Sequence, residues 1–123
     1  MRKQYFFRES EQGLLAWDVD RLVDLSRDFP RIVVPLDQIG ELDRLWAGDG
    51  EQPTWRSMVE HMHLIADADL SFPIIIAANG EIMDGRHRLA KAALQKLDAI
   101  VAVQFMVDPD PDYVGISPED LPY

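Results

Sequence analysis

Cysteine is absent from the sequence. Its absence excludes disulfide bonds, thiolate metal sites and a cysteine nucleophile, and it makes a cytoplasmic location the expectation. Long apolar runs are also missing, since no stretch approaches the roughly 20 residues that a membrane-spanning helix needs. Met1-Arg2-Lys3 is soon followed by Tyr5-Phe6-Phe7 and then by charged residues, a pattern that does not resemble a signal peptide. We therefore expect no membrane association.

Basic residues are few: 12 lysines and arginines stand against 22 acidic residues, for a formal net charge of −10. A domain that neutralises many DNA phosphates needs a basic face, so this balance disfavours nucleic acid as a partner. A small anionic ligand is still compatible with it. Exposed charges more than about 10 Å apart are largely screened, whereas a local basic cluster acts at close range.

The length and apolar content predict one small mixed α/β domain with a buried core. The chain has 123 residues, of which 47% are hydrophobic, and we place the domain at residues 1–106. Residues 107–123 contain four prolines and five acidic residues. We expect them to form an irregular acidic tail packed on the surface, or alternatively a segment that binds a protein partner. Its expected apolar anchors are Tyr113, Val114, Ile116, Leu121 and Tyr123.

Local signals in the first half predict a helix, a strand and a helical turn. Asp18 is placed as the N-cap of the helix within a hydrophobic staple, and Pro30 ends this segment. The β-branched run at 32–34 predicts a strand that leads into a short helical turn over 37–42. The loop at 46–53 is either a solvated connection or a segment that lines a site.

A second helix is expected from a cap at Thr54 to about Ala68. Apolar residues at helical spacing predict that one face lies in the core: Trp55, Met58, Val59, Met62, Ile65 and Ala66. His61 and His63 point in different directions on a helix, which excludes a zinc site built from this pair. One flank of this helix carries Arg56, Glu60 and His63. It is either a surface ion-pair row or the rim of an anion site.

The second half predicts a β-hairpin, a helix and a closing strand. Residues 72–78 form the apolar run typical of a strand covered on both faces, and Asn79-Gly80 is a strong hairpin signal leading into 81–83. The apolar stretch 99–106 predicts the last strand. We expect a right-handed crossover that joins strands 81–83 and 99–106. The end of strand 81–83 would then lie at the carboxyl edge of the sheet, where ligands bind in such folds.

The stretch from Asp84 to Arg88 is where the sequence indicates chemistry. Gly85 precedes Arg86, His87 and Arg88, which fall in the first turn of a predicted helix, where backbone N–H groups lack intrahelical partners. These donors and the helix dipole favour an anion, and the side chains would add charge-assisted hydrogen bonds. Alternatively, the cluster only balances the many acids. Asp84 either caps the helix through the His87 N–H, binds Mg²⁺ or acts as a general base.

The order of these segments resembles the ParB/sulfiredoxin superfamily over roughly residues 31–106. The match rests on Ile32-Val33-Val34-Pro35-Leu36-Asp37-Gln38-Ile39, on Phe72-Pro73-Ile74-Ile75-Ile76 with its Asn-Gly hairpin, and most specifically on Asp84-Gly85-Arg86-His87-Arg88. In that superfamily the motif that corresponds to residues 84–88 binds the phosphates of a nucleotide: CTP in ParB partition proteins, ATP in sulfiredoxins and ADP in free-serine kinases. The resemblance implies a stand-alone ParB-like N-terminal domain that binds ATP, ADP or CTP, with Mg²⁺.

Departures from the family pattern narrow the implied function. Sulfiredoxins carry a catalytic cysteine at the position of Arg86, so sulfinic acid reduction is not expected here. ParB partition proteins contain an Asn-Pro-x-Gln-Pro-Arg-like box and a helix-turn-helix domain, whereas this chain offers only Gln52-Pro53 with Arg56. Centromere binding is therefore not supported.

The candidate site residues follow from the motif and from the resemblance. Those for phosphate or nucleotide binding are Gly85, Arg86, His87, Arg88 and Arg56. Those for catalysis are Asp84, also the candidate Mg²⁺ ligand, and Glu41, by analogy with the kinases. We expect a phosphate- or nucleotide-binding protein. The alternatives are a nucleotide-dependent small-molecule kinase or nucleotide hydrolase, a noncatalytic nucleotide-sensing module and, least supported, a ParB-like nuclease or other DNA-associated protein.

Overall fold

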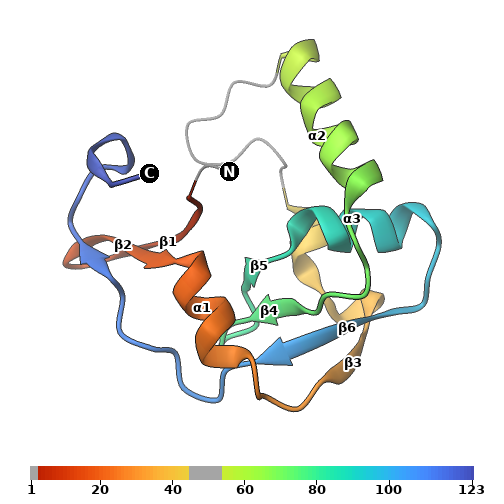
Figure 1. Cartoon of the computed structure of the whole chain (residues 1–123), viewed down its shortest axis with the longest axis horizontal. Coiled ribbons are helices and arrows are strands. Elements are labelled where there is room, and N and C mark those ends of the chain that lie inside the picture. The colour runs from red at the N-terminus through yellow and green to blue at the C-terminus, as the bar shows by residue number, and fades with distance from the viewer. Residues whose placement is uncertain (1–2, 45–53) are drawn as a thin grey trace.

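Two small β-sheets and three α-helices make up the residues that the computed structural model describes, 3–44 and 54–123 (Figure 1). One sheet has three strands in the order β1-β2-β7, and the other has four in the order β3-β6-β4-β5. This is the mixed α/β class predicted from the sequence. Among the helices of these residues, none is long and apolar enough to cross a membrane.

The three-stranded sheet joins the N-terminal hairpin to the tail. β1 (Tyr5–Ser10) and β2 (Gly13–Asp18) pair antiparallel, and β7 (Tyr113–Val114) adds to the other edge of β2. The Trp17 indole N–H also donates to the carbonyl of Pro109 at 2.8 Å. The tail thus contributes a strand where we expected an irregular segment.

The anchors of the tail differ from those expected. Of the five apolar side chains named for this role, only Leu121 is buried, with 5% of its surface exposed. Val114, Ile116 and Tyr123 are exposed. Hydrogen bonds made by the hairpin therefore supplement apolar burial in holding the tail.

Helix α1 (Val19–Ser26) begins as the sequence predicts. The Asp18 carboxylate accepts a hydrogen bond from the Asp20 N–H at 2.9 Å, which is the N-cap arrangement. Trp17 and Leu22 are both buried in the same apolar cluster, as the hydrophobic staple requires. The helix ends at Ser26, ahead of Pro30.

The four-stranded sheet corrects the predicted crossover. It contains β3 (Ile32–Pro35), β4 (Ile74–Ile76), β5 (Ile82–Asp84) and β6 (Ala99–Gln104). β4 lies between β5 and β6, antiparallel to β5 and parallel to β6. β5 and β6 are therefore neither neighbours nor parallel, so the predicted crossover between them is wrong. Because β5 runs against β4, it ends beside the start of β4, and no shared carboxyl edge forms there.

Side chains alternate across this sheet and build an apolar core on each face. One face packs with α1 and the N-terminal hairpin through Phe6, Trp17, Leu22, Ile75, Ala77, Met83, Val103 and Phe105. The other packs with α3 (Arg86–Leu94) and the turn after β3 through Ile39, Ile74, Ile76, Ile82, Leu89, Ala92, Ile100 and Ala102. All of β4 is buried, as predicted for a strand covered on both faces. The helical turn after β3 is also confirmed, as two 3₁₀ segments at Leu36–Gln38 and Gly40–Asp43.

Helix α2 (Trp55–Asp67) lies outside both cores, so the prediction that its apolar stripe is buried is wrong. Its start is as predicted, because Thr54 forms a capping box with Ser57. None of its residues is buried, and Trp55 is 82% exposed. Figure 1 shows α2 extending away from the four-stranded sheet, beyond α3. The loop at 46–53, considered above as a site-lining segment, lies outside the described residues.

Candidate functional site

Gly85 sets the entry to α3 by its backbone conformation and its close packing. It is the N-cap of the helix, with φ +104°, a region that side chains other than glycine rarely occupy. A Cβ atom here would lie 2.6 Å from Cγ2 of Ile74 and 2.9 Å from Nη2 of Arg88. A glycine is therefore needed both for the turn and for the approach of β4.

The three basic residues do occupy the first turn of α3, as predicted, but their side chains diverge. The Arg86 Nε donates at 2.6 Å to Glu41, which lies in the 3₁₀ segment Gly40–Asp43. The Arg88 Nη2 donates to Asp84 at 3.0 Å. His87 meets His61 of α2. Consecutive helical residues are about 100° apart around the axis, so three in a row reach three different neighbours.

Asp84 does not cap α3. Its carboxylate accepts from Arg88, and no side chain caps the N-terminus of this helix among the described residues. Arg88 also donates to the Pro73 carbonyl at 3.3 Å. The pair therefore links the end of β5, the first turn of α3 and the residue before β4.

The contact between His61 and His87 was not foreseen from the sequence. Nδ1 of His61 lies 2.9 Å from Nε2 of His87, so one ring donates and the other accepts. His63 points elsewhere, with Nε2 at 3.2 Å from the Asp67 carboxylate. Within the described residues, no three metal-ligating side chains of His, Cys, Asp or Glu come together. The two rings join α2 to α3 across 26 positions of sequence, a separation that no local motif reveals.

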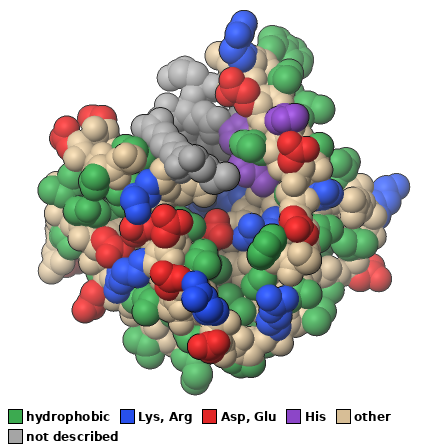
Figure 2. All heavy atoms as spheres, viewed as in Figure 1, with side chains coloured by type: hydrophobic (Ala, Val, Ile, Leu, Met, Phe, Trp, Pro, Cys, Tyr) green, Lys and Arg blue, Asp and Glu red, His purple; other side chains and the backbone are tan. Residues whose placement is uncertain are grey.

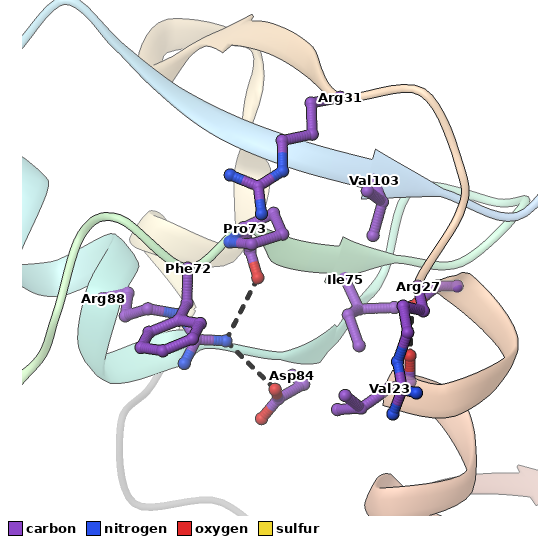
Figure 3. A pocket seen from close by; sticks show the side chains of 10 residues that line it. Val23, Arg27, Arg31, Phe72, Pro73, Ile75, Asp84, Arg88 and Val103 are labelled. Atoms are coloured by element: carbon purple, nitrogen blue, oxygen red, sulfur yellow. Dashed lines mark hydrogen bonds and ion pairs between the residues drawn. The ribbon is translucent and has the colours of Figure 1, made fainter.

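A pocket of about 240 Å³ opens between α1, the start of β4 and the end of β5 (Figure 3). Its apolar wall is formed by Val23, Phe72, Ile75 and Val103. Its polar lining includes three arginines and one carboxylate, Arg27, Arg31, Arg88 and Asp84. In Figure 3, Arg88 and Arg27 lie on opposite sides of the pocket with Asp84 between them. The lining therefore carries an excess of positive charge.

The arginines of the pocket differ in how firmly they are held. Arg27 pairs with Asp24 at 2.5 Å, and both side chains are largely exposed. Arg31 donates to the Ser71 carbonyl at 3.3 Å. Arg88 is mostly buried, and its Nε has no hydrogen-bond partner among the described residues. A buried donor without an acceptor is costly, so an oxygen ligand near this group would be stabilised.

The pocket contains only part of the site predicted from the sequence. Asp84 and Arg88 line it, whereas Gly85, Arg86 and His87 do not. Glu41 is engaged with Arg86, and Arg56 is exposed on α2. Sequence reasoning missed Arg27, Arg31 and Phe72. Only the placement of α1 beside β4 and β5 brings these residues together, and no spacing in the sequence signals it.

Comparison with protein-family models, curated proteins and solved structures gave no match. The fold and the pocket define the class: a small mixed α/β protein with a basic pocket at one end of its four-stranded sheet. The resemblance to the ParB/sulfiredoxin superfamily stays a prediction.

Proposed function

We propose that the protein binds a small phosphate-bearing ligand in the pocket beside α1. The observation that carries this proposal is the convergence of three arginines on one pocket from two separate segments: Arg27 and Arg31 from the connection between α1 and β3, and Arg88 from the first turn of α3. The chain has only 12 basic residues and a net charge of −10, so three arginines around one pocket are a strong local excess. Guanidinium groups match the oxygens of phosphate in geometry and charge.

Arg88 would form the inner contact of this site. Its Nε is a buried donor without an acceptor in the described residues. Because the Arg88 side chain lines the pocket, we propose that an oxygen of the bound phosphate supplies the missing acceptor. Arg27 is available at the rim because its pair with Asp24 is exposed, and such pairs contribute only about 0–1 kcal/mol. Two or three charge-assisted hydrogen bonds from the arginines to a bound anion stabilise the complex by more than the loss of this ion pair costs.

The ligand best suited to this lining is a nucleotide, with ADP, ATP and CTP as the candidates. Phe72 lines the pocket and is 59% exposed, which leaves a ring face on which a base can stack. The volume of about 240 Å³ lies just below the roughly 300–1,000 Å³ of pockets that enclose a whole ligand. The phosphates would therefore be held inside, and the base would lie at the mouth.

Calorimetric titration with inorganic phosphate, ADP, ATP and CTP, with and without Mg²⁺, tests the proposal. Arg27→Gln and Arg31→Gln should each weaken binding about tenfold, the effect of one exposed charge-assisted hydrogen bond. Arg86→Gln and Arg56→Gln are the matched controls, because they remove the same charge outside the pocket, and they should bind as the parent does. Loss of affinity in Arg86→Gln, with Arg27→Gln and Arg31→Gln unchanged, would place the anion at the start of α3 instead. No binding of any of the four ligands at millimolar concentration would refute the proposal.

A second candidate, nucleotide-dependent phosphoryl transfer or hydrolysis, is favoured by the position of Asp84. Its carboxylate lies in the pocket beside the arginines, where it can orient a hydroxyl or water or bind Mg²⁺. Mg²⁺ would have to compete with Arg88 for it. Turnover of ATP or ADP with Mg²⁺ that is lost in Asp84→Asn, while binding persists, would support catalysis. Binding without turnover in the parent protein would leave a nucleotide-sensing module.

A further inference from the structure

The outer side of α2 carries an apolar row that the described chain leaves uncovered. Trp55, Val59 and Met62 are 82%, 62% and 60% exposed, and Ala66 continues the row at the same helical spacing. Figure 2 shows hydrophobic side chains gathered along the outer edge of this helix. A contiguous apolar row of this kind marks an interaction surface more often than scattered exposed residues do.

The opposite side of α2 is already used within the molecule. Lys91 of α3 donates to the carbonyls of Ala66 and Ala68 at 2.9 and 2.7 Å, which caps the C-terminal end of α2. His61 meets His87 on the same side of the helix. These polar contacts fix α2 on α3 and turn the apolar row outward. Packing against the chain's own core therefore does not account for the row.

We propose that the outer side of α2 binds a second copy of this chain, with the two helices antiparallel about a two-fold axis. Antiparallel packing reverses the order of the row, so Trp55 of one protomer lies opposite Ala66 of its partner. Val59 then lies opposite Met62 in the same register. The largest side chain meets the smallest and two medium-sized ones meet each other, which is the size match that close packing of two helices needs.

The charges beside the row fit the same arrangement. A charged row runs along one flank of α2, with the same spacing as the apolar row and shifted by one residue. It consists of Arg56, Glu60, His63 and Asp67. A two-fold axis perpendicular to the helices brings the charged rows of the two copies together on one side. Arg56 then lies opposite Asp67, and Glu60 opposite His63. Their register differs from that of the apolar pairs by two residues, roughly 3 Å, which long side chains span.

The length of the row sets the strength of this dimer. Positions 55 to 66 cover about 17 Å of helix at 1.5 Å per residue, so one helix pair forms the contact. Interfaces of this size fall below the standard class and belong to reversible, concentration-dependent complexes. The dimer is therefore expected to dissociate on dilution.

Sedimentation velocity of the full chain tests the proposal between about 10 µM and about 1 mM, the range in which small interfaces dissociate. The 14.0 kDa chain should pass from monomer to dimer across this range. Met62→Glu should abolish the dimer without unfolding the protein, because this side chain is already exposed. Met106→Glu, at a position 94% exposed, is the matched control and should leave the dimer intact.

A charge exchange tests the orientation of the helices. Arg56→Glu and Asp67→Arg should each weaken the dimer about threefold or more, as expected when an attractive exposed pair becomes repulsive. The double variant should recover the parent's association. A chain that stays monomeric at about 1 mM, a dimer that survives Met62→Glu, or a double variant weaker than either single one would each overturn the proposal.

Discussion

Replacing Gly85 with alanine should destabilise the protein by about 2–5 kcal/mol, through two effects that the structure separates. The left-handed conformation at φ +104° costs a residue with a Cβ roughly 1–2 kcal/mol. The new Cβ would also lie 2.6 Å from Cγ2 of Ile74, a buried side chain in β4 that cannot move away freely. Overpacking of this kind costs about 1–3 kcal/mol.

Two other glycines serve as controls for these two effects. Gly80 has a similar φ of +95° but no heavy atom within 4 Å of its Cβ position, so Gly80→Ala should lose only the conformational part, about 1–2 kcal/mol. Gly40 has neither strain nor a neighbour, and Gly40→Ala should change stability by less than about 0.5 kcal/mol.

Urea unfolding followed by circular dichroism gives the free energy of unfolding for each variant. The expected order of stability is Gly40→Ala above Gly80→Ala above Gly85→Ala. Equal losses for Gly80→Ala and Gly85→Ala would show that the approach of Ile74 to Gly85 is not tight. A loss below about 0.5 kcal/mol for Gly85→Ala, the scatter of neutral surface changes, would refute both parts of the reasoning.

Two further predictions concern the end of α3 and the start of α1. Lys96 lies just after the C-cap of α3, with φ 58°, in a Schellman motif. Lys96→Gly should therefore stabilise the protein by about 0.5–1 kcal/mol and raise its melting temperature. An unchanged or lower melting temperature would contradict this. Although burial raises the pKa of Asp18, hydrogen bonds from Lys3 and the Asp20 N–H together lower it below 3.8. A lowered pKa in the folded state contributes stability above pH 3.8 that is lost as the pH falls through the folded value. The free energy of unfolding of Asp18→Asn should therefore fall less steeply than that of the parent below about pH 4. An equally steep fall in both proteins would argue against the role of this carboxylate.

Local signals predicted most elements of the fold because those signals act over a few residues. The Asp18 cap, the Thr54 cap and the turn at Asn79-Gly80 each satisfy backbone groups within three or four positions, and all are found where expected. Strand order was not predictable in this way. The position of β4 between β5 and β6 depends on pairing across the sheet, and the sequence pattern alone fits more than one order.

The apolar stripe of α2 shows a different limit. Helical spacing of Trp55, Val59 and Met62 predicts an amphipathic helix, and that part is right. The same pattern does not distinguish a face buried in the chain's own core from a face that is left for a partner. Burial is decided by whether another element covers the face, and here α3 takes the other side.

The candidate site was predicted only in part, because a sequence motif shows which residues are close along the chain and not which distant segments meet. Asp84 and Arg88 are four residues apart across a strand-to-helix turn, so the motif brings them together locally. Arg27 and Arg31 reach the same pocket from a segment more than 50 positions away. No local pattern marks them, since Arg27 directly follows α1 and Arg31 directly precedes β3, where an arginine is an ordinary residue.

The central claim is that phosphate binds in the pocket beside α1, and an amide NMR titration of the isotopically labelled protein with ADP tests it most directly. The account predicts saturable shifts in the backbone amides of the non-proline residues in 23–31 and 71–75 and of residues 84 and 88, which surround the pocket. It also predicts that these shifts are lost in Arg31→Gln. Shifts confined to residues 85–87 and to the start of α2, or no saturable shifts at millimolar ADP, would contradict it.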